Sequence, residues 1–251
     1  MHFAFSKYEG TGNDFILVDN RNEGTPLELV NIPKLCHRQY GVGADGFILI
    51  GTSSQADVSM RIFNSDGREA EMCGNGLRCL ARFLKDKGEN LEKVHVETLN
   101  RVYLCETVDE EIQVGMGVPE VLREQKGEML INVGVPHLVV FVEDLDRFDR
   151  EAKERFSALG VNINYAKMTS SGSIMMRTFE RGVEKETFSC GTGATAVCLG
   201  GWKQFGLKNQ VEVLFHSKER LWFDLCVEGE ELKEIYMRGQ VRLVFDGKVR
   251  I

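Results

Sequence analysis

Two cysteines occupy the same short motif, one in each half of the chain. Cys73 begins Cys-Gly-Asn-Gly, Cys190 begins Cys-Gly-Thr-Gly, and each motif stands just before a helix-like segment. The first turn of a helix presents backbone N–H groups and a partial positive charge, which together suit an anion such as a carboxylate. The same position lowers the pKa of a thiol towards neutrality. The pair therefore predicts a carboxylate site flanked by two sulfurs that can take and give protons.

A single cysteine in such a motif would most simply be a buried residue at a tight turn. Two cysteines at equivalent places of a repeated sequence favour the chemical interpretation instead. The other five cysteines lack this context and are expected to be structural: Cys36, Cys79, Cys105, Cys198 and Cys226. A zinc site is disfavoured, because the chain has no Cys-x2-Cys pair and its five histidines are scattered. No phosphate-cradling Walker motif or Schiff-base lysine motif is apparent.

The stretch Gly41-Val-Gly-Ala-Asp-Gly46 matches the glycine spacing of a dinucleotide-binding fingerprint. That fingerprint requires a strand before it and a helix after it. Here a helix-like segment precedes the glycines and a strand-like segment, FILIG, follows them. We therefore predict a glycine-rich turn that lines a site, without a bound dinucleotide.

The two cysteine motifs belong to a longer repeat. Residues 60–76 read MRIFNSDGREAEMCGNG, and residues 176–193 read MRTFERGVEKETFSCGTG. Helix-like segments follow at 77–87 and 194–205, each ending near a glycine as a helix C-cap would. Strand-like alternation comes next in both copies, and GTGNDFILVDN upstream of the first parallels GVPHLVVFVEDL upstream of the second.

The repeat predicts a duplicated α+β fold with two similar halves, residues 1–122 and 130–251. Each half consists mostly of short strands around one main helix, and residues 119–129 form the junction. A pseudo-two-fold relation between the halves would place two like residues on opposite sides of one ligand. The duplication therefore suggests how a pair of cysteines could serve one reacting atom.

Composition narrows the classes of function. The net charge is -7, and no cluster of lysine and arginine indicates nucleic-acid binding. No apolar run approaches the length of a membrane span, and the N-terminus lacks the pattern of a signal peptide. Seven cysteines are an odd number and too few for a disulfide scaffold. We expect a cytoplasmic protein with free thiols that acts on a small molecule and binds neither nucleic acid nor membrane. A homodimer is one alternative for its oligomeric state.

Further polar residues stand beside glycine-containing turns. They are Asn13 in GTGNDF, Asn64 in FNSDG, Asn162 in GVNINYA, and Glu180 with Arg181 in FERG. Each alone is most simply a turn residue. Together with the cysteine motifs they predict a pocket for a zwitterion, in which arginine grips a carboxylate and the amides donate and accept hydrogen bonds.

These motifs resemble those of the diaminopimelate epimerase family over essentially the whole chain. GTGNDF, FNSDGREAEMCGNGLRC, the Pro-His pair, FERG and SCGTGATA occur in the order that this family shows. The resemblance implies two domains, each a mostly antiparallel sheet curled around a central helix, with the site between them. It implies conversion of LL-diaminopimelate to the meso form without pyridoxal phosphate or metal, for lysine and peptidoglycan-precursor synthesis. Proline racemases share a related two-cysteine plan, and phenazine-biosynthesis isomerases share the fold without both cysteines.

The resemblance also assigns roles to particular residues. It implies that Cys73 and Cys190 are the two acid–base groups, one acting as thiolate while the other acts as thiol. The donors to the carboxylate at the reacting centre would be Gly74, Asn75, Gly191 and Thr192. The substrate contacts would be Asn13, Asn64, Asn162, Glu180 and Arg181, with Arg181 on the distal carboxylate. His137 and Glu180 would set the protonation of the cysteines.

Two residues differ from those that are usual in this family. Gly46 stands where Gln is usual, and Val135 stands where Asn is usual, both at positions associated with the distal end of the substrate. The departures suggest a relaxed specificity that includes racemisation of glutamate. The alternatives are a racemase acting mainly on glutamate or aspartate, and a non-catalytic amino-acid-binding relative, which would not need paired thiols.

Overall fold

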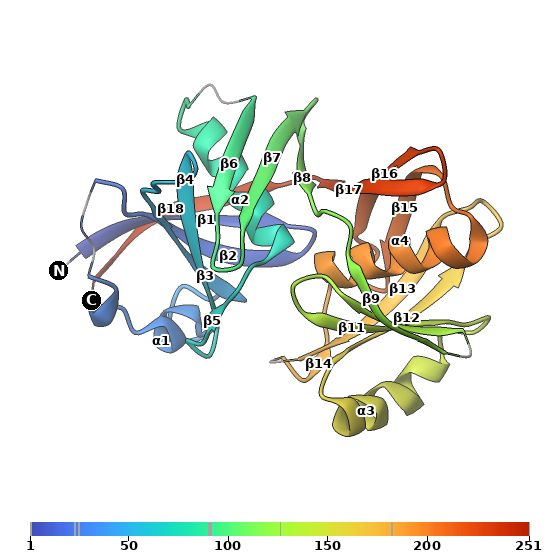
Figure 1. Cartoon of the computed structure of the whole chain (residues 1–251). Coiled ribbons are helices and arrows are strands. Elements are labelled where there is room, and N and C mark those ends of the chain that lie inside the picture. Colours follow the sequence, from blue (N-terminus) through green and yellow to red (C-terminus); the bar gives the residue numbers. More distant parts are fainter. Residues whose placement is uncertain are drawn as a thin grey trace. The chain divides into compact units, whose positions relative to one another are not determined.

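The structure is a computed structural model that describes residues 2–22, 24, 26–89, 92–125, 127–181 and 183–250. The chain divides into two compact units. The first contains Met1–Val114 and Gly239–Ile251, and the second contains Gly115–Arg238. Each unit is a sheet with one central helix (Figure 1).

The first unit carries its strands in the order β18-β1-β2-β3-β4-β6-β7-β8, with the short β5 beside β4. Neighbouring strands are antiparallel except for the parallel pairs β2–β3 and β4–β6. The elements are β1 (His2–Gly10), β2 (Asn13–Asp19), η1 (Leu27–Leu29), α1 (Ile32–Cys36), β3 (Gly46–Gly51), β4 (Val58–Asn64), β5 (Glu69–Ala70), α2 (Gly74–Asp86), β6 (Lys93–Glu97), β7 (Val102–Val108), β8 (Glu111–Gly115) and β18 (Arg242–Arg250).

The second unit repeats this arrangement with the strand order β9-β10-β11-β12-β13-β15-β16-β17 and the short β14 beside β13. Its parallel pairs, β11–β12 and β13–β15, fall at the equivalent places. The elements are β9 (Glu120–Gln125), β10 (Glu128–Asn132), β11 (Pro136–Phe141), α3 (Arg147–Leu159), β12 (Asn162–Met168), β13 (Ile174–Glu180), β14 (Lys185–Glu186), α4 (Gly191–Phe205), β15 (Asn209–Phe215), β16 (Arg220–Glu228) and β17 (Glu231–Gly239). The predicted fold class, a duplicated and mostly antiparallel α+β unit, is confirmed.

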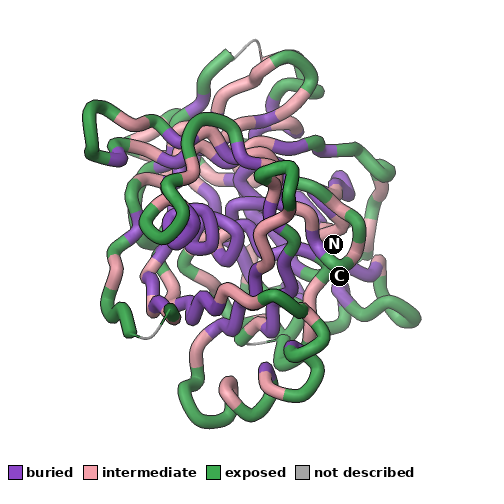
Figure 2. The backbone as a smooth tube through the Cα atoms, turned by 90° about the vertical axis from the view of Figure 1, so that its right-hand side faces the viewer, coloured by how far each residue is buried: buried purple, intermediate pink, exposed green. Residues whose placement is uncertain are grey.

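The central helices α2 and α4 form the core of their units. Leu77, Leu80 and Leu84 of α2 are almost completely buried, and α4 is buried from Ala194 to Leu199. Burial follows the inner segments of the chain, while the outlying turns are exposed (Figure 2). Removing these apolar side chains from water is the main source of stability for each unit.

Both helices begin a turn earlier than the sequence predicted, directly after their cysteines. The first turn lies close to the sheet, and a Cβ at Gly76 would come within 3.0 Å of Ile62 and 3.1 Å of Ile48. Glycine lowers helix propensity but permits this approach. The predicted helix ends are confirmed, since Gly88 and Gly206 both have positive φ near the C-terminus of their helix.

The expected boundaries at residues 122 and 130 are corrected by strand pairing. The predicted junction, residues 119–129, contains β9, which pairs with β10 inside the second unit. The last strand, β18, pairs with β1 inside the first unit. β18, a strand of the second sequence half, is therefore exchanged into the first unit, and β9 of the predicted junction joins the second unit.

The chain consequently passes between the units twice, at Val114–Gly115 and Arg238–Gly239. Just inside the second unit the two passing segments are hydrogen-bonded, from Met116 N to Ile235 O and from Ile235 N to Gly117 O. Pairing of β18 with β1 brings both ends of the chain into the first unit.

No helix among the described residues is long and apolar enough to cross a membrane. All seven cysteines are free thiols. Cys36, Cys79, Cys105 and Cys198 are buried, and burial raises the pKa of each thiol, to about 12 for Cys36 and Cys105. A protonated, buried thiol packs as a small apolar group, as predicted for these positions.

The exchanged strand β18 can be tested through Gly247, which lies opposite Phe5 of β1. A Cβ at Gly247 would come within 2.6 Å of the Phe5 ring, so Gly247→Val should lower the free energy of unfolding by about 1–3 kcal/mol. Urea denaturation gives the loss, and hydrogen exchange should place it in β1. Lys248→Val, on the exposed neighbouring position, is the matched control. Unchanged protection of β1 in Gly247→Val would contradict the assignment of β18 to the first unit.

Candidate active site

Cys73 is the N-cap residue of α2 and is half-buried. Its extended backbone (φ -148°, ψ 119°) turns the chain into the helix, and its carbonyl accepts the first intrahelical bond, from Leu77 N at 2.9 Å. The backbone N–H groups of residues 74–76 consequently point out of the helix end beside the sulfur. The Cys73 side chain makes no capping hydrogen bond with these groups.

Two amide side chains in series lie against the Cys73 sulfur. Asn13 Oδ1 is 3.9 Å from Cys73 Sγ and accepts a hydrogen bond from Asn75 Nδ2 at 3.3 Å. Asn13 Nδ2 donates to the Asp45 carboxylate at 3.0 Å, and Asn75 Oδ1 accepts from Arg78 at 2.6 Å. Because a carboxylate only accepts and a guanidinium only donates, the orientation of both amides follows.

A cluster of charged residues holds Asn13 in place. Arg38 binds Asp14 through two hydrogen bonds of 3.0 and 2.9 Å and also donates to Asp45 at 2.8 Å. Burial would raise the pKa of Asp14, but hydrogen bonds from Arg38 and Lys7 outweigh it and lower that pKa to about 2. The glycine-rich loop that carries Asp45 therefore braces GTGNDF and runs from α1 to β3, as its sequence context predicted.

Arg78 lies one turn into α2 and is fully buried inside the first unit. Besides Asn75 it donates to Thr11 Oγ1 at 2.8 Å and to the Gln240 carbonyl at 3.2 Å. No carboxylate of the described residues forms an ion pair with it, and its Nε has no hydrogen-bond partner there. Desolvation lowers the pKa of this guanidinium from its usual value. Where it remains charged, its field adds to that of the helix N-terminus in favouring an anion.

Cys190 is the N-cap residue of α4 and is 5% exposed. Its sulfur accepts a hydrogen bond from Gly193 N at 3.4 Å and lies 3.5 Å from Thr192 Oγ1. Gly193 is required by crowding, since a Cβ there would come within 2.4 Å of Asn164 Oδ1 and 3.2 Å of the sulfur. The second cysteine thus repeats the backbone position of the first with different surroundings.

His137 lies at the centre of the polar side chains of the second unit. Its Nε2 is 3.0 Å from Thr192 Oγ1, and its Nδ1 is 3.1 Å from Asn164 Nδ2. The ring is completely buried, and this desolvation lowers its pKa to about 3, with a smaller contribution from the charge of Arg181. His137 is consequently a neutral imidazole near pH 7, with one nitrogen that donates and one that accepts.

Of the other predicted residues of this unit, Asn162 lies against His137, and Glu180 and Arg181 lie at and just after the end of β13. Asn162 is buried, its Nδ2 is 3.4 Å from His137 Nε2, and its Oδ1 accepts from the backbone N of Arg181 at 2.8 Å. Glu180 accepts a hydrogen bond from Thr187 Oγ1 at 3.0 Å, while the Arg181 side chain is exposed. Gly182, which completes the FERG motif, lies outside the described residues.

Most of the predicted residues gather around their own cysteine. Asn13, Gly74 and Asn75 adjoin Cys73, while His137, Asn162, Gly191 and Thr192 lie around Cys190. Asn64 is exposed at the end of β4, and no hydrogen bond described in the structure joins its side chain to Cys73. Within each unit these positions remain candidates for contact with a ligand.

Sequence reasoning did not assign Arg78 or Asn164 a role at the site. Each residue had a feature in the sequence that could have identified it as a candidate. Arg78 interrupts the apolar side of a helix that is buried almost throughout. Asn164 is two residues after Asn162 in a strand, so the two side chains lie on the same face.

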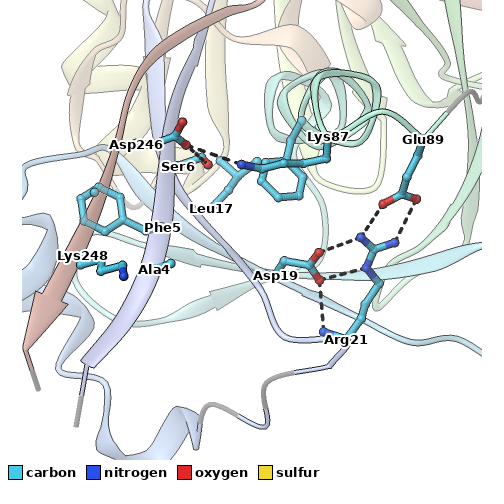
Figure 3. Close-up of a pocket in the computed structure, with 12 residues that line it drawn as sticks. Ala4, Phe5, Ser6, Leu17, Asp19, Arg21, Lys87, Glu89, Asp246 and Lys248 are labelled. Carbon is cyan, nitrogen blue, oxygen red and sulfur yellow. Dashed lines mark hydrogen bonds and ion pairs between the residues drawn. The ribbon is translucent and has the colours of Figure 1, made fainter.

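A concave pocket of about 620 Å³ lies elsewhere in the first unit (Figure 3). It is lined by β1, β2, β18 and the segment after α2, about 20 Å along the helix from Cys73. Arg21 lies between Asp19 and Glu89, with ion-pair distances of 2.7 and 2.6 Å. These paired charges fasten β2 to the segment that follows α2, and the pocket is separate from the cysteines.

Solved structures of the same fold include several isomerase families. A phenazine biosynthesis protein of Bacillus anthracis superposes with a TM-score of 0.77 over all of both chains, at 18% identity. A hydroxyproline epimerase from Agrobacterium vitis gives a TM-score of 0.71, at 13% identity and 99% coverage of this chain and 92% of the other. At these identities the comparison defines the class of fold.

Sequence similarity is more specific. The pattern of the family described as diaminopimelate epimerase matches residues 5–122 and 129–244. The diaminopimelate epimerase of Aquifex aeolicus is 38% identical over 98% of this chain and 97% of the relative. That of Archaeoglobus fulgidus is 38% identical over 100% of this chain and 98% of the relative. The chain belongs to the diaminopimelate epimerase family and is an isomerase, as its motifs indicated.

The neutral state of His137 predicts how stability depends on pH. Its pKa falls from 6.5 to about 3 on folding, so the unfolded chain binds an extra proton between those values. The free energy of unfolding should therefore fall as pH decreases through this window, by about 1.4 kcal/mol per pH unit from this group. Urea denaturation should show a shallower fall for His137→Gln, and the exposed His216→Gln is the control. Equal slopes in all three proteins would contradict a neutral His137.

Proposed function

We propose that this enzyme converts LL-diaminopimelate to meso-diaminopimelate without a cofactor, using Cys73 and Cys190 as two acid–base groups. The observation that carries the proposal is the placement of each cysteine as the N-cap of a buried helix. There a sulfur stands beside backbone N–H groups that can bind a carboxylate. The family supports amino-acid epimerisation, and the proposed place in metabolism is lysine and peptidoglycan-precursor synthesis in the cytoplasm.

The chemistry follows from charge development at the α-carbon. Removing the α-proton of an amino acid builds negative charge on the adjacent carboxylate, and preoriented donors are the most effective way to stabilise it. One cysteine, as thiolate, takes the α-proton from one face of the carbon. The other, as thiol, delivers its proton to the opposite face. Each turnover thus inverts the centre and exchanges the protonation of the two sulfurs.

Each surrounding residue would contact a particular part of the substrate. Residues 74, 75, 191 and 192 would donate to the carboxylate at the reacting centre. Asn13, Asn64, Asn162 and Glu180 would contact the remaining groups, and Arg181 would bind the distal carboxylate. The exposed side chains of Asn64 and Arg181 suit this role, since both are open to a ligand. His137 and Glu180 would support the protonation of the cysteines.

Replacing either Cys73 or Cys190 with Ala should lower the rate of epimerisation by at least about a thousandfold, because each face has one acid–base group. The measurement is conversion of LL-diaminopimelate to the meso form, with kcat and KM determined separately. Cys226→Ala, at an exposed thiol on β16, should retain full activity. Circular dichroism should show that all three variants are folded.

Substantial turnover at saturating substrate by either single variant would overturn the two-cysteine mechanism. A protein that binds diaminopimelate tightly but exchanges no α-hydrogen with deuterated water would instead be the non-catalytic relative. The two results are distinguishable, since only the first retains catalysis in a single-cysteine variant.

We further propose that specificity is relaxed enough to include glutamate. Gly46 is buried at the start of β3, and a Cβ there would lie 2.8 Å from the Phe63 carbonyl oxygen. Backbone packing therefore explains Gly46, and glutamine could not be introduced without moving β4. Val135 is half-buried in the turn between β10 and β11, and its side chain cannot form a hydrogen bond. The proposal rests on Val135.

Val135→Asn should raise the ratio of kcat/KM for diaminopimelate to that for glutamate by about tenfold or more. One hydrogen bond to a charged group contributes about 1.5–3 kcal/mol, and glutamate lacks the distal ammonium group that would donate this bond to the introduced amide oxygen. The kcat/KM values for both substrates come from α-hydrogen exchange in deuterated water. Val135→Leu, which adds no polar group, should leave the ratio unchanged. Absence of any exchange on glutamate in the parent enzyme would refute the relaxed specificity.

A further inference from the structure

We propose that the two cysteines of the free enzyme rest in different protonation states, Cys190 as the thiolate and Cys73 as the thiol. Two hydrogen-bond chains of opposite direction set these states, and Asn164 is a positioning residue that orients the chain at Cys190. The inference rests on the proposed two-thiol function and deepens it. Each chain lies within one unit.

The chain at Cys190 starts from the amide of Asn164. Its Nδ2 donates to the Leu138 carbonyl at 3.1 Å, and its Oδ1 accepts from Thr178 Oγ1 at 3.0 Å. A carbonyl can only accept, so the orientation of this amide is determined. The second hydrogen of Nδ2 points at His137 Nδ1, 3.1 Å away.

That contact selects the tautomer of His137. An N–H group facing Nδ1 requires Nδ1 to be the unprotonated nitrogen, so the ring hydrogen of the neutral imidazole is on Nε2. Nε2 then donates to Thr192 Oγ1 at 3.0 Å. The Thr192 hydroxyl is left to donate its own hydrogen to Cys190 Sγ at 3.5 Å.

One contact opposes this tautomer. Asn162 Nδ2 lies 3.4 Å from His137 Nε2, which makes two donors face each other. The other tautomer would instead place two donors at 3.1 Å, between Asn164 and Nδ1, and would leave Thr192 unsuited to donate to sulfur. The shorter contact is the more costly one to leave mismatched, so the geometry favours hydrogen on Nε2.

Cys190 Sγ therefore faces two donors, the Thr192 hydroxyl and the backbone N–H of Gly193. Hydrogen bonds donated to a sulfur favour its charged form. The helix N-terminus acts in the same direction. Together they favour a thiolate at this position.

The chain at Cys73 runs the other way. It begins at the Arg78 guanidinium, continues through Asn75 and Asn13, and ends at the Asp45 carboxylate. Charged groups at both ends orient the amides, so the atom that faces Cys73 Sγ is the carbonyl oxygen of Asn13, at 3.9 Å. An acceptor beside sulfur favours the protonated thiol, which can donate to it.

Other charged groups stand on the elements that pack against each sulfur. Near Cys73 they are Arg78, Asp45, Asp14, Arg38 and Lys7, with the carboxylates of Glu9 and Glu111 acting on Arg78 at longer range. In the unit of Cys190 they are Arg181, whose charge acts on His137, and Glu180, which accepts a hydrogen bond from Thr187. The charge of Arg78 and the start of α2 favour a thiolate at Cys73, against the effect of the Asn13 carbonyl oxygen, so each thiol has to be titrated directly.

The asymmetry has a consequence for turnover. A substrate whose α-hydrogen faces Cys190 meets the base at once, and the proton moves from carbon to that sulfur while Cys73 gives its own proton to the other face. The enzyme leaves this turnover with a Cys190 thiol and a Cys73 thiolate. Proton exchange with water must then restore the resting form before the same isomer reacts again.

Thiolate absorbance in the ultraviolet, titrated against pH without substrate, reports each sulfur independently of its accessibility. Cys73→Ala with Cys226→Ser leaves Cys190 to titrate, and Cys190→Ala with Cys226→Ser leaves Cys73. The four buried cysteines stay protonated over the range used, because burial raises their pKa. The Cys190 midpoint should lie below the Cys73 midpoint by about one pH unit or more.

Thr192 provides a matched pair of variants in the Cys190 background. Thr192→Val keeps the shape and removes the hydroxyl, so the Cys190 midpoint should rise, whereas Thr192→Ser keeps the hydroxyl and should not shift it. Asn164→Leu should raise the midpoint as well, since His137 is no longer held in one tautomer. The 15N chemical shifts of His137 in the parent enzyme should show hydrogen on Nε2.

A Cys73 midpoint at or below that of Cys190, or hydrogen on His137 Nδ1, would overturn this inference. Neither result would touch the proposed epimerase function, which the single-cysteine activity assays test separately. Conversely, catalysis by a single-cysteine variant would refute the two-thiol function even if the titration order were as expected.

Discussion

Each unit depends on enclosing one helix almost completely while giving the first turn of that helix polar surroundings. The backbone N–H groups at a helix start have no partners within the helix, so that end cannot be packed into an apolar core. Cys73 and Cys190 cap these two ends, and glycines in the first turn let the helix lie against its sheet. The candidate site of each unit is therefore where its core must become polar.

The polar residues around the two caps do different work, although the backbones repeat. Asn75 and Thr192 occupy the equivalent position, two residues after each cysteine. Asn75 links a buried guanidinium to Asn13, whereas Thr192 links a buried neutral imidazole to the Cys190 sulfur. Duplication thus supplies two similar helix ends, and divergence of a few side chains gives them distinct electrostatic surroundings. The proposed two-base inversion requires that one sulfur accept a proton while the other gives one, and these surroundings favour one such assignment in the free enzyme.

The pairing of two strands, β18 and β9, decides which segments of the chain form each unit. β18 completes the first sheet beside β1, and β9 completes the second beside β10. The second half of the sequence therefore supplies one strand to the first unit, and the predicted junction supplies one to the second. This pairing makes the compact units differ from the halves that the repeat delimits. The first unit can be complete only when the last strand, β18, has paired with the first strand, β1.

The duplication, the fold class, the position of two cysteines at helix starts and the segments that become central helices could all be predicted from the sequence alone. These features are local: they depend on period, on glycine position and on motifs that repeat within one chain. Even the helix ends at Gly88 and Gly206 followed from local backbone preference.

The strand exchange, the contacts of Arg78 and Asn164, and the packing that requires glycine at Gly46 emerge only in the folded chain. Each of these depends on atoms from segments distant in the sequence. Asn164 acquires its role by lying between the Leu138 carbonyl and the His137 ring, and a single sequence does not specify such an arrangement. The direction of a hydrogen bond is a property of the whole network, because every amide in it must satisfy both of its neighbours at once.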